Sequence, residues 1–395
     1  MKILFLSQRV PYPPNKGDKL RSFNEIKYLS RTHQISLACL TDNEADLRHA
    51  QELRAYCSSV DIVTLSPLRS RINAMLALFS AQPLTCAYFF SPDLQELVTR
   101  KLREEVFDLI MVYCSSMAQY VDKVNHIPKV IDFVDVDSEK WQQYAHYAPF
   151  PQNLIYRIES RRVRSYEAKL ARTYQHCFLV SEKECKDFRN LVVASETVTP
   201  ILNGVDLEMF QPASEPYNPH VLVFTGAMDY FANVEAVLYF VREILPLIQS
   251  QIPDLMFYVV GSNPAHEISV LPKTHPNVII TGFVDSVRPY VVNAAVFVAP
   301  MRIARGVQNK ILEAMAMGVP VVTTSLGFEG ISAIPGRDLF VVDDPKSFAH
   351  FVVQLIQDDK MRLETSANAR RIVEDNYDWS RNLGTLELVL KGVRL

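Results

Sequence analysis

The chain has 395 residues, of which 48% are hydrophobic and 22% are charged, and its formal net charge is −3 at pH 7. That length exceeds what one ordinary hydrophobic core supports, so we expect two domains. The slightly acidic balance argues against nucleic acid as the main partner. The six cysteines form no Cys-x-x-Cys pair, which favours reduced, packed thiols over a disulfide framework or a zinc site.

The N-terminal residues MKILFLS predict a first buried strand and not a secretion signal. Their apolar run is short, and no small-residue cleavage site follows it. No stretch of the chain approaches the roughly 18 apolar residues that cross a bilayer. We therefore expect a cytoplasmic protein that touches the inner face of the membrane at most, as a peripheral contact.

Short β-rich runs alternate with helical stretches such as 18–32 and 93–105. Strands separated by helices of this length predict βαβ units and doubly wound parallel sheets. The first series of predicted strands comprises 2–7, 34–40, 60–65, 107–113, 129–133 and 177–181. The second series comprises 220–226, 255–261, 277–283, 295–300, 319–324 and 338–343.

A proline-rich polar segment with an Asn-Gly pair separates the two series and predicts a linker. The expected organisation is an N-terminal Rossmann-like domain (1–202), a linker (203–219), a second Rossmann-like domain (220–375) and a C-terminal helix (376–395). Two such α/β sheets are expected to face a cleft at the carboxyl ends of their strands, where open sheets bind ligands.

The glycine motifs of the common nucleotide cofactors are missing. The first strand is followed by QRVPYPPNKGDKLRS, and the second half opens with TGAMDYFAN, each with a single glycine. Neither segment fits the Gly-x-Gly-x-x-Gly fingerprint of dinucleotide enzymes, and no P-loop motif occurs in the sequence. We therefore expect no bound cofactor.

The stretch ARGVQNKILEAMAMGVPVVTT (304–324) concentrates charge at the start of a predicted helix, 308–317. A helix N-terminus at a sheet edge favours an anion. Gly306 permits close backbone approach, while Arg302, Arg305 and Lys310 can bind phosphate oxygens. Glu313 can accept hydrogen bonds from sugar hydroxyls. The plain alternative is a surface helix with a Lys310–Glu313 pair above a core face.

At this point the sequence resembles the GT-B retaining glycosyltransferases of family 4 (glycosyl transferases group 1), of the kind found in exopolysaccharide biosynthesis. The segments that carry the resemblance are PILNGVDLEMFQP, VLVFTGAMD, FYVVG, ITGFVD and NKILEAMAMGVPVVTT. The resemblance implies transfer of a hexose from a nucleoside-diphosphate sugar, carrying UDP or GDP, to a hydroxyl of a glycan or lipid-linked acceptor. It also implies that the C-terminal helix (376–395) returns to the first domain.

The resemblance assigns donor-binding roles in the second domain. Glu313 would bind the donor ribose, Gly226 would lie at a donor-side strand end, and the turn Gly282-Phe283-Val284 would hold the edge of the base. The sequence departs from the family where residue 305, commonly a glutamate, is arginine. It also lacks the basic pair that commonly follows the Thr-Gly turn.

Positive charge has instead gathered at Arg302, Arg305 and Lys310. Together with the helix N-terminus, these groups are expected to stabilise the leaving diphosphate without a metal, since no Asp-x-Asp stands at a donor-side strand end. Lys310 and Arg302 are therefore catalytic candidates.

The first domain is expected to hold the acceptor. The loop PYPPNKGDKLRS (11–22) follows the first strand, and the resemblance places acceptor and phosphate contacts there. Its candidate residues are Lys16, Gly17, Asp18 and Arg21. The alternative is a proline-stiffened loop with a Gly-Asp helix start.

Three acids, Asp132, Asp135 and Asp137, follow another strand of the first domain. They suggest binding of acceptor hydroxyls, and Asp135 is the third catalytic candidate because it matches best the family's polar position. The competing interpretations are a divalent metal site and an N-cap provided by Asp137 to a helix at 138–147.

The basic run RIESRRVRSYEAKLAR (157–172) predicts either a solvated helix face or a surface that rests on anionic lipid. Two other functions stay open at this stage. One is a GT-B-fold nucleotide-sugar epimerase that needs no acceptor. The other is a non-catalytic subunit that binds a nucleotide sugar, which Arg305 in place of the family acid would suit.

Overall fold

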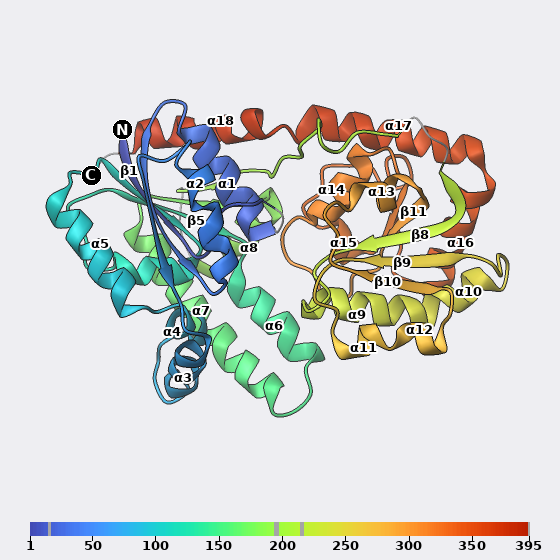
Figure 1. Cartoon of the computed structure of the whole chain (residues 1–395), viewed down its shortest axis with the longest axis horizontal. Helices are drawn as coiled ribbons and strands as arrows, with labels where there is room; N and C mark the ends of the chain where they lie inside the picture. The colour runs from blue at the N-terminus through green and yellow to red at the C-terminus, as the bar shows by residue number, and fades with distance from the viewer. Residues whose placement is uncertain (15–16, 193–196, 214–216, 394–395) are drawn as a thin grey trace. The chain divides into compact units, whose positions relative to one another are not determined.

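The computed structural model describes residues 1–14, 17–192, 197–213 and 217–393 (Figure 1). The chain divides into two compact units. Unit 1 comprises Met1–Leu202 together with Ser380–Leu395, and unit 2 comprises Asn203–Trp379. All six cysteines are free thiols, and five of them are buried. Within the described ranges, no helix combines the length and the apolar character that crossing a membrane requires.

Unit 1 is built on a seven-stranded parallel sheet with the order β3-β2-β1-β4-β5-β6-β7. The sheet grows from β1 in both directions, which is the doubly wound arrangement. Because β1 is buried on both faces of the sheet, its sequence KILFLS is a continuous apolar run without alternation. The strands are β1 (Lys2–Ser7), β2 (Gln34–Thr41), β3 (Ser59–Thr64), β4 (Leu109–Tyr113), β5 (Lys129–Val134), β6 (His176–Leu179) and β7 (Val198–Pro200).

Helices cover the sheet of unit 1. They are α1 (Gly17–Leu29), α2 (Ala50–Leu53), α3 (Pro67–Ala77), α4 (Leu84–Tyr88), α5 (Pro92–Glu104), α6 (Asp137–Tyr147), α7 (Gln152–Thr173), α8 (Glu182–Val192) and α18 (Trp379–Gly392), with 3₁₀ turns at Glu44–His49 and Ser115–Tyr120. The C-terminal helix α18 packs on unit 1, where Glu387 Oε2 lies 2.9 Å from His33 Nε2.

One helix start differs from its prediction. Helix α6 begins at Asp137 itself, and Val136 occupies the N-cap position without a side-chain cap in the described structure. The predicted N-cap role of Asp137 is therefore wrong. Its carboxylate lies in the first turn, where the helix dipole favours negative charge, and it contacts Lys140 and accepts from Ser115 Oγ at 3.4 Å.

Unit 2 repeats the same topology with six parallel strands in the order β10-β9-β8-β11-β12-β13. The predicted fold class of two Rossmann-like parallel sheets is thus confirmed. The strands are β8 (Asn218–Thr225), β9 (Met256–Val260), β10 (Val278–Gly282), β11 (Ala294–Ala299), β12 (Val321–Thr323) and β13 (Phe340–Val341). The only described strand without a prediction is β7, whose three residues are too few to show a pattern.

Two helices of unit 2 begin at an aspartate whose side chain caps the first turn. Asp344 accepts from Ser347 N at the start of α16, and Asp358 accepts from Met361 N at the start of α17. The helices are α9 (Phe231–Tyr239), α10 (Leu245–Gln249), α11 (His266–Ser269), α12 (Leu271–Thr274), α13 (Arg288–Val292), α14 (Asn309–Ala316), α15 (Ser325–Phe328), α16 (Pro345–Gln357) and α17 (Asp359–Asn376), with a π-turn at Phe240–Ile244.

The first residues of unit 2 pack against its last ones. Val205 N donates to Tyr377 O at 2.8 Å. A Cβ atom at Gly204 would lie 2.5 Å from Trp379 Cγ, so only glycine fits there. The Asn203-Gly204 pair of the predicted linker is therefore held against the segment that leads into α18.

Candidate functional site

Two glycines shape the carboxyl edge of the unit 2 sheet. Gly226 follows β8 and Gly261 follows β9, and Gly226 N donates to Val260 O at 3.0 Å. A Cβ atom at position 261 would overlap the carbonyl oxygen of Gly226, so the two turns approach as bare backbone. Strand β8 stands where the strand order reverses, and open α/β sheets bind their ligands at this switch point.

Helix α14 brings Lys310 to the same edge. The loop before the helix turns at Gly306, whose φ of +65° is a left-handed conformation that favours glycine. The apolar face of α14 is buried, as its pattern predicts. At its C-terminal end, Arg370 Nη1 donates to Ala316 O at 2.6 Å, and near its start Asn203 Nδ2 donates to Asn309 Oδ1 at 2.9 Å. Both ends of the helix are therefore fixed.

Lys310 is held across the switch point by α9. Its Nζ atom donates to Asn233 Oδ1 at 2.5 Å and lies 4.3 Å from the centroid of the Phe224 ring. Asn233 Nδ2 donates to Ala227 O at 2.9 Å, which orients the amide so that its oxygen faces the lysine. A Cβ atom at Gly226 would lie 3.1 Å from Lys310 Nζ. The ammonium group thus lies directly beside the bare turn after β8.

The environment of α14 disfavours isolated charge. Burial lowers the pKa of Lys310 to about 7, and the nearby Glu313 carboxylate acts in the opposite direction. Burial likewise raises the pKa of Glu313 to about 7, against the effect of Lys310. An anionic group bound beside Lys310 would restore the charged form of the lysine. The site is therefore chemically suited to an anion such as a diphosphate.

The two predicted arginines lie on the loop between β11 and α14. Arg302 is exposed, its Nη1 atom is 3.3 Å from Glu235 Oε1, and its guanidinium lies 4.8 Å from the centroid of the Tyr239 ring. Arg305 is half-buried, and its carbonyl oxygen accepts from Gln308 Nε2 at 3.3 Å. Both arginines thus flank the start of α14, and Arg302 is already engaged with α9.

The predicted base-binding turn lies at the same sheet edge, two strands away from β8. Gly282 is the last residue of β10, an edge strand of the sheet. Phe283 follows it and is 71% exposed, while Val284 is half-buried. An exposed aromatic ring at the end of a strand suits a planar base.

Sequence reasoning missed three residues of this site. Asn233 binds Lys310 across 77 positions of the chain, and no local pattern indicates that contact. Phe224 is an ordinary strand residue in the sequence. Gly261, in contrast, ends the strand FYVVG just as Gly226 ends VLVFTG, and this parallel between two strand ends could have identified it.

In unit 1 the structure corrects the role of Arg21. This side chain is only 1% exposed, and its Nε atom donates to Asp132 Oδ2 at 2.6 Å, while Nη1 donates to Ile201 O at 2.7 Å. Burial and the Asp132 carboxylate raise the pKa of the adjacent Glu25 well above its usual range. Arg21 and Asp132 therefore form a buried ion pair that joins α1 to β5, and neither is presented to an acceptor.

Of the other residues predicted in this loop, Gly17 is exposed at the start of α1. Lys16 and the side chain of Asp18 lie outside the described part of the chain.

Asp135 remains at the carboxyl end of β5. It follows Val134, whose φ of +68° is rare for a β-branched residue. Burial and the Glu184 carboxylate raise the pKa of Asp135 to about 7. Across the described residues, no group of three or more His, Cys, Asp or Glu side chains is arranged to hold a metal ion.

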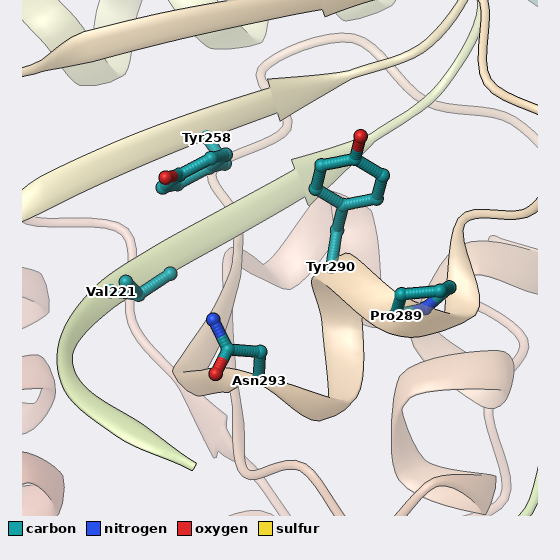
Figure 2. Close-up of a pocket in the computed structure, with 5 residues that line it drawn as sticks. All are labelled: Val221, Tyr258, Pro289, Tyr290 and Asn293. Atoms are coloured by element: carbon teal, nitrogen blue, oxygen red, sulfur yellow. The ribbon is translucent and has the colours of Figure 1, made fainter.

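A separate hollow of about 220 Å³ lies elsewhere on unit 2. Figure 2 shows Tyr258 of β9 and Tyr290 of α13 above it, with Asn293 and Val221 below, and the two rings have centroids 6.2 Å apart. Val221 lies near the start of β8, whereas Gly226 follows its end. The hollow contains none of the predicted site residues.

Comparison with known proteins finds a family model that matches part of unit 2. Residues 219–358, about a third of the chain, match the family model described as glycosyl transferases group 1. This range contains β9 to β13, all of β8 except Asn218, and α14 with Lys310.

Two curated bacterial proteins are similar to longer parts of the chain. An uncharacterized 44.6 kDa protein in the cps region of Klebsiella pneumoniae is 23% identical over 95% of this chain and 96% of its own length. The putative teichuronic acid biosynthesis glycosyltransferase TuaC of Bacillus subtilis is 25% identical, covering 73% of this chain and 72% of its own.

Two solved structures share the architecture. Sucrose-phosphate synthase from Thermosynechococcus elongatus has a TM-score of 0.77 at 16% identity, over 99% of this chain and 98% of that one. Anabaena HepE, solved in complex with UDP-glucose, has a TM-score of 0.68 at 16% identity over the full length of both chains. The fold is thus that of the GT-B glycosyltransferases.

Proposed function

We propose that this protein is a retaining glycosyltransferase that moves a hexose from a nucleoside-diphosphate sugar to a hydroxyl of a glycan or lipid-linked acceptor in exopolysaccharide assembly. The observation that carries the proposal is Lys310, desolvated beside the bare Gly226 turn at the switch point of a Rossmann-like sheet. The match to glycosyl transferases group 1 and the similarity to TuaC support the same activity. HepE, which shares the fold, binds UDP-glucose.

The donor would lie along the carboxyl edge of unit 2. Its diphosphate would take the position beside Lys310 and the α14 N-terminus, with Arg302 and Arg305 on the flanking loop. Glu313 would accept hydrogen bonds from the ribose. The base, that of UDP or GDP, would rest against the main chain of Gly282–Val284.

The reaction breaks the bond between the anomeric carbon and the diphosphate oxygen and forms one to the acceptor oxygen. Negative charge develops on the departing diphosphate, and the ammonium group of Lys310 stabilises that charge most in the transition state. The acceptor hydroxyl would approach from the leaving-group face and give its proton to a diphosphate oxygen. The cationic side chains make the step independent of a divalent metal. On the acceptor side, Asp135 would bind a hydroxyl of the incoming glycan.

A ligand screen followed by product analysis tests the proposal. UDP, GDP and their sugar conjugates are compared by thermal shift, and a ligand at 100 times its Kd stabilises its site by about 2.7 kcal/mol. The stabilising nucleotide sugar is then incubated with and without a bacterial lipid and glycan extract. We expect a sugar to move to the extract and the nucleoside diphosphate to be released.

Two outcomes would overturn the transferase. Conversion of the sugar itself, at a rate that the extract does not change, would identify a nucleotide-sugar epimerase. Tight binding without any turnover, in the presence of every extract, would identify a binding subunit. We also propose that the protein acts in the cytoplasm as a peripheral partner of the membrane.

A further inference from the structure

Helix α3 of unit 1 directs its large apolar side chains into solvent. Most amphipathic helices of a globular protein do the reverse and bury the apolar stripe. Phe79, just after the helix, is 92% exposed, and the other four residues are 46% to 69% exposed. We call these residues the docking face: Leu68, Ile72, Met75, Leu76 and Phe79.

The docking face is continuous along the helix. At about 100° per residue, the four helical members fall within one sector about 100° wide. The residues that face the protein on the opposite side are small, since Ser70 and Ala77 are the buried residues of this helix. The packing of α3 on unit 1 therefore uses Ser and Ala and leaves Leu, Ile and Met outside.

Two arginines border the docking face. On the same helical projection, Arg69 lies just beyond one edge of the apolar sector and Arg71 just beyond the other. Both side chains are exposed. Residues 62–92 contain no aspartate or glutamate at all. An apolar sector with a basic border and no acid is the pattern of a helix that lies in the interface of an anionic membrane.

The neighbouring helix α7 holds the end of α3. Arg162 of α7 donates to Ala77 O at 2.8 Å and to Leu78 O at 2.9 Å, which fixes the end of α3 against it. Figure 1 shows α3 and α4 beside α7 at the lower end of unit 1. The exposed charged residues of α7 are all basic, because its two acids are buried.

Those two acids serve internal contacts. Glu159 accepts from Leu84 N at 2.6 Å and from Thr85 N at 2.8 Å, and Glu167 accepts from Ser138 Oγ at 2.6 Å. The basic run that the sequence suggested for lipid thus lies on α7, which Arg162 joins to the end of α3, and within this run Arg164 and Lys169 pair with Glu139 and Asp122.

We propose that the docking face lies in the headgroup region of an anionic bilayer, with Arg69 and Arg71 against the lipid phosphates. A second copy of the chain suits this surface less well, because the positive rims of two identical faces would meet and repel. The exposed apolar side chains would gain burial on contact with lipid. This inference is independent of the transfer chemistry, and its test needs no substrate.

The test is co-sedimentation of the full chain with vesicles. Phosphatidylcholine vesicles are compared with mixed phosphatidylglycerol–phosphatidylcholine vesicles at low salt. The wild-type chain is expected to bind the anionic vesicles at least tenfold more tightly than the neutral ones. The triple variant Met75→Ser, Leu76→Ser, Phe79→Ser should lose at least tenfold in binding, with an unchanged melting temperature because the replaced side chains are exposed.

Two further variants separate the apolar and basic contributions. Arg69→Gln with Arg71→Gln should remove most of the preference for anionic vesicles, since each basic residue contributes roughly a factor of five to ten at such a surface. The matched control is Leu388→Ser on α18, which is 72% exposed and lies away from α3 in the sequence. It should bind as the wild type does.

Three results would overturn the proposal. The first is a wild-type chain that binds neither vesicle, and the second is a triple variant that binds as well as the control. The third is a wild-type chain that is dimeric by light scattering and becomes monomeric in the triple variant, with equal vesicle binding for both. That result would assign the face to a second copy.

Discussion

Replacing Lys310 with methionine should lower activity and raise stability. The buried ammonium group destabilises the folded protein, but it is the group that we expect to bind the diphosphate. The variant keeps the length of the side chain and removes its charge. It also removes the hydrogen bond to Asn233 Oδ1 and the cation above the Phe224 ring. We expect turnover of the donor to fall by roughly 10²-fold or more, the scale for losing one transition-state charge contact.

The stability of the variant should rise at neutral pH. Burial lowers the pKa of Lys310 from 10.5 to about 7. The folded protein therefore holds fewer protons than the unfolded chain between pH 7 and 10.5, and wild-type stability rises with pH across this window. At pH 7 and below, the charged lysine costs the folded state roughly 4 kcal/mol. Allowing about 1 kcal/mol for the lost hydrogen bond and a discount for partial exposure, we expect a net gain of about 2 kcal/mol for Lys310→Met.

The assays are urea unfolding at pH 7 and pH 9.5, and calorimetric titration with UDP. The stability gap between variant and wild type should be wider at pH 7 than at pH 9.5. Wild-type UDP binding should take up a proton near pH 8, because the diphosphate restores the charged lysine, and the variant should not. The matched control Lys360→Met replaces an exposed lysine of α17 and should change neither quantity. A folded Lys310→Met protein with turnover within threefold of wild type would refute the placement of the diphosphate.

The remaining predictions concern the ribose contact, the metal and the core of unit 1. Glu313→Ala should raise the KM for the nucleotide sugar about tenfold and leave kcat nearly unchanged, since a ribose contact exists in both ground and transition states; a lower melting temperature with an unchanged KM would make Glu313 a structural residue. Activity should persist in excess EDTA, and complete loss that Mg²⁺ or Mn²⁺ reverses would contradict the metal-independent mechanism. Arg21→Met should lower the free energy of unfolding of unit 1, measured in urea, by about 3–5 kcal/mol, because Asp132 is left buried without its partner. The double variant Arg21→Met, Asp132→Leu should recover most of that loss. A single variant as stable as wild type would show that the ion pair does not contribute to stability.

The sequence by itself determined the architecture and the position of α14 with its basic start. Strands buried on both faces of a parallel sheet need apolar residues at every position, so runs such as KILFLS are visible without any tertiary information. The helix after β11 was equally visible, because its apolar period, its basic start and the following Gly-Val-Pro are all local signals.

Only the tertiary structure decided which charged groups are available to a ligand. Arg21 and Lys310 both follow a strand of a Rossmann-like sheet, yet Arg21 meets Asp132 across 111 positions and is buried by that pairing. Lys310 instead donates to an amide oxygen of Asn233, and its ammonium group lies beside the Gly226 turn. Such partners are far apart in the chain, and no local pattern can indicate them.

The same limit applies to α3. Its periodicity defines an apolar sector but does not state whether that sector faces the protein or the solvent. The direction depends on how α3 packs against α7. Two α7 side chains fix this packing, since Arg162 donates to the main chain at the end of α3 and Glu159 accepts from the main chain at the start of α4. The sequence pattern of a helix specifies which of its sides is apolar, whereas only the packed structure specifies whether that side is buried.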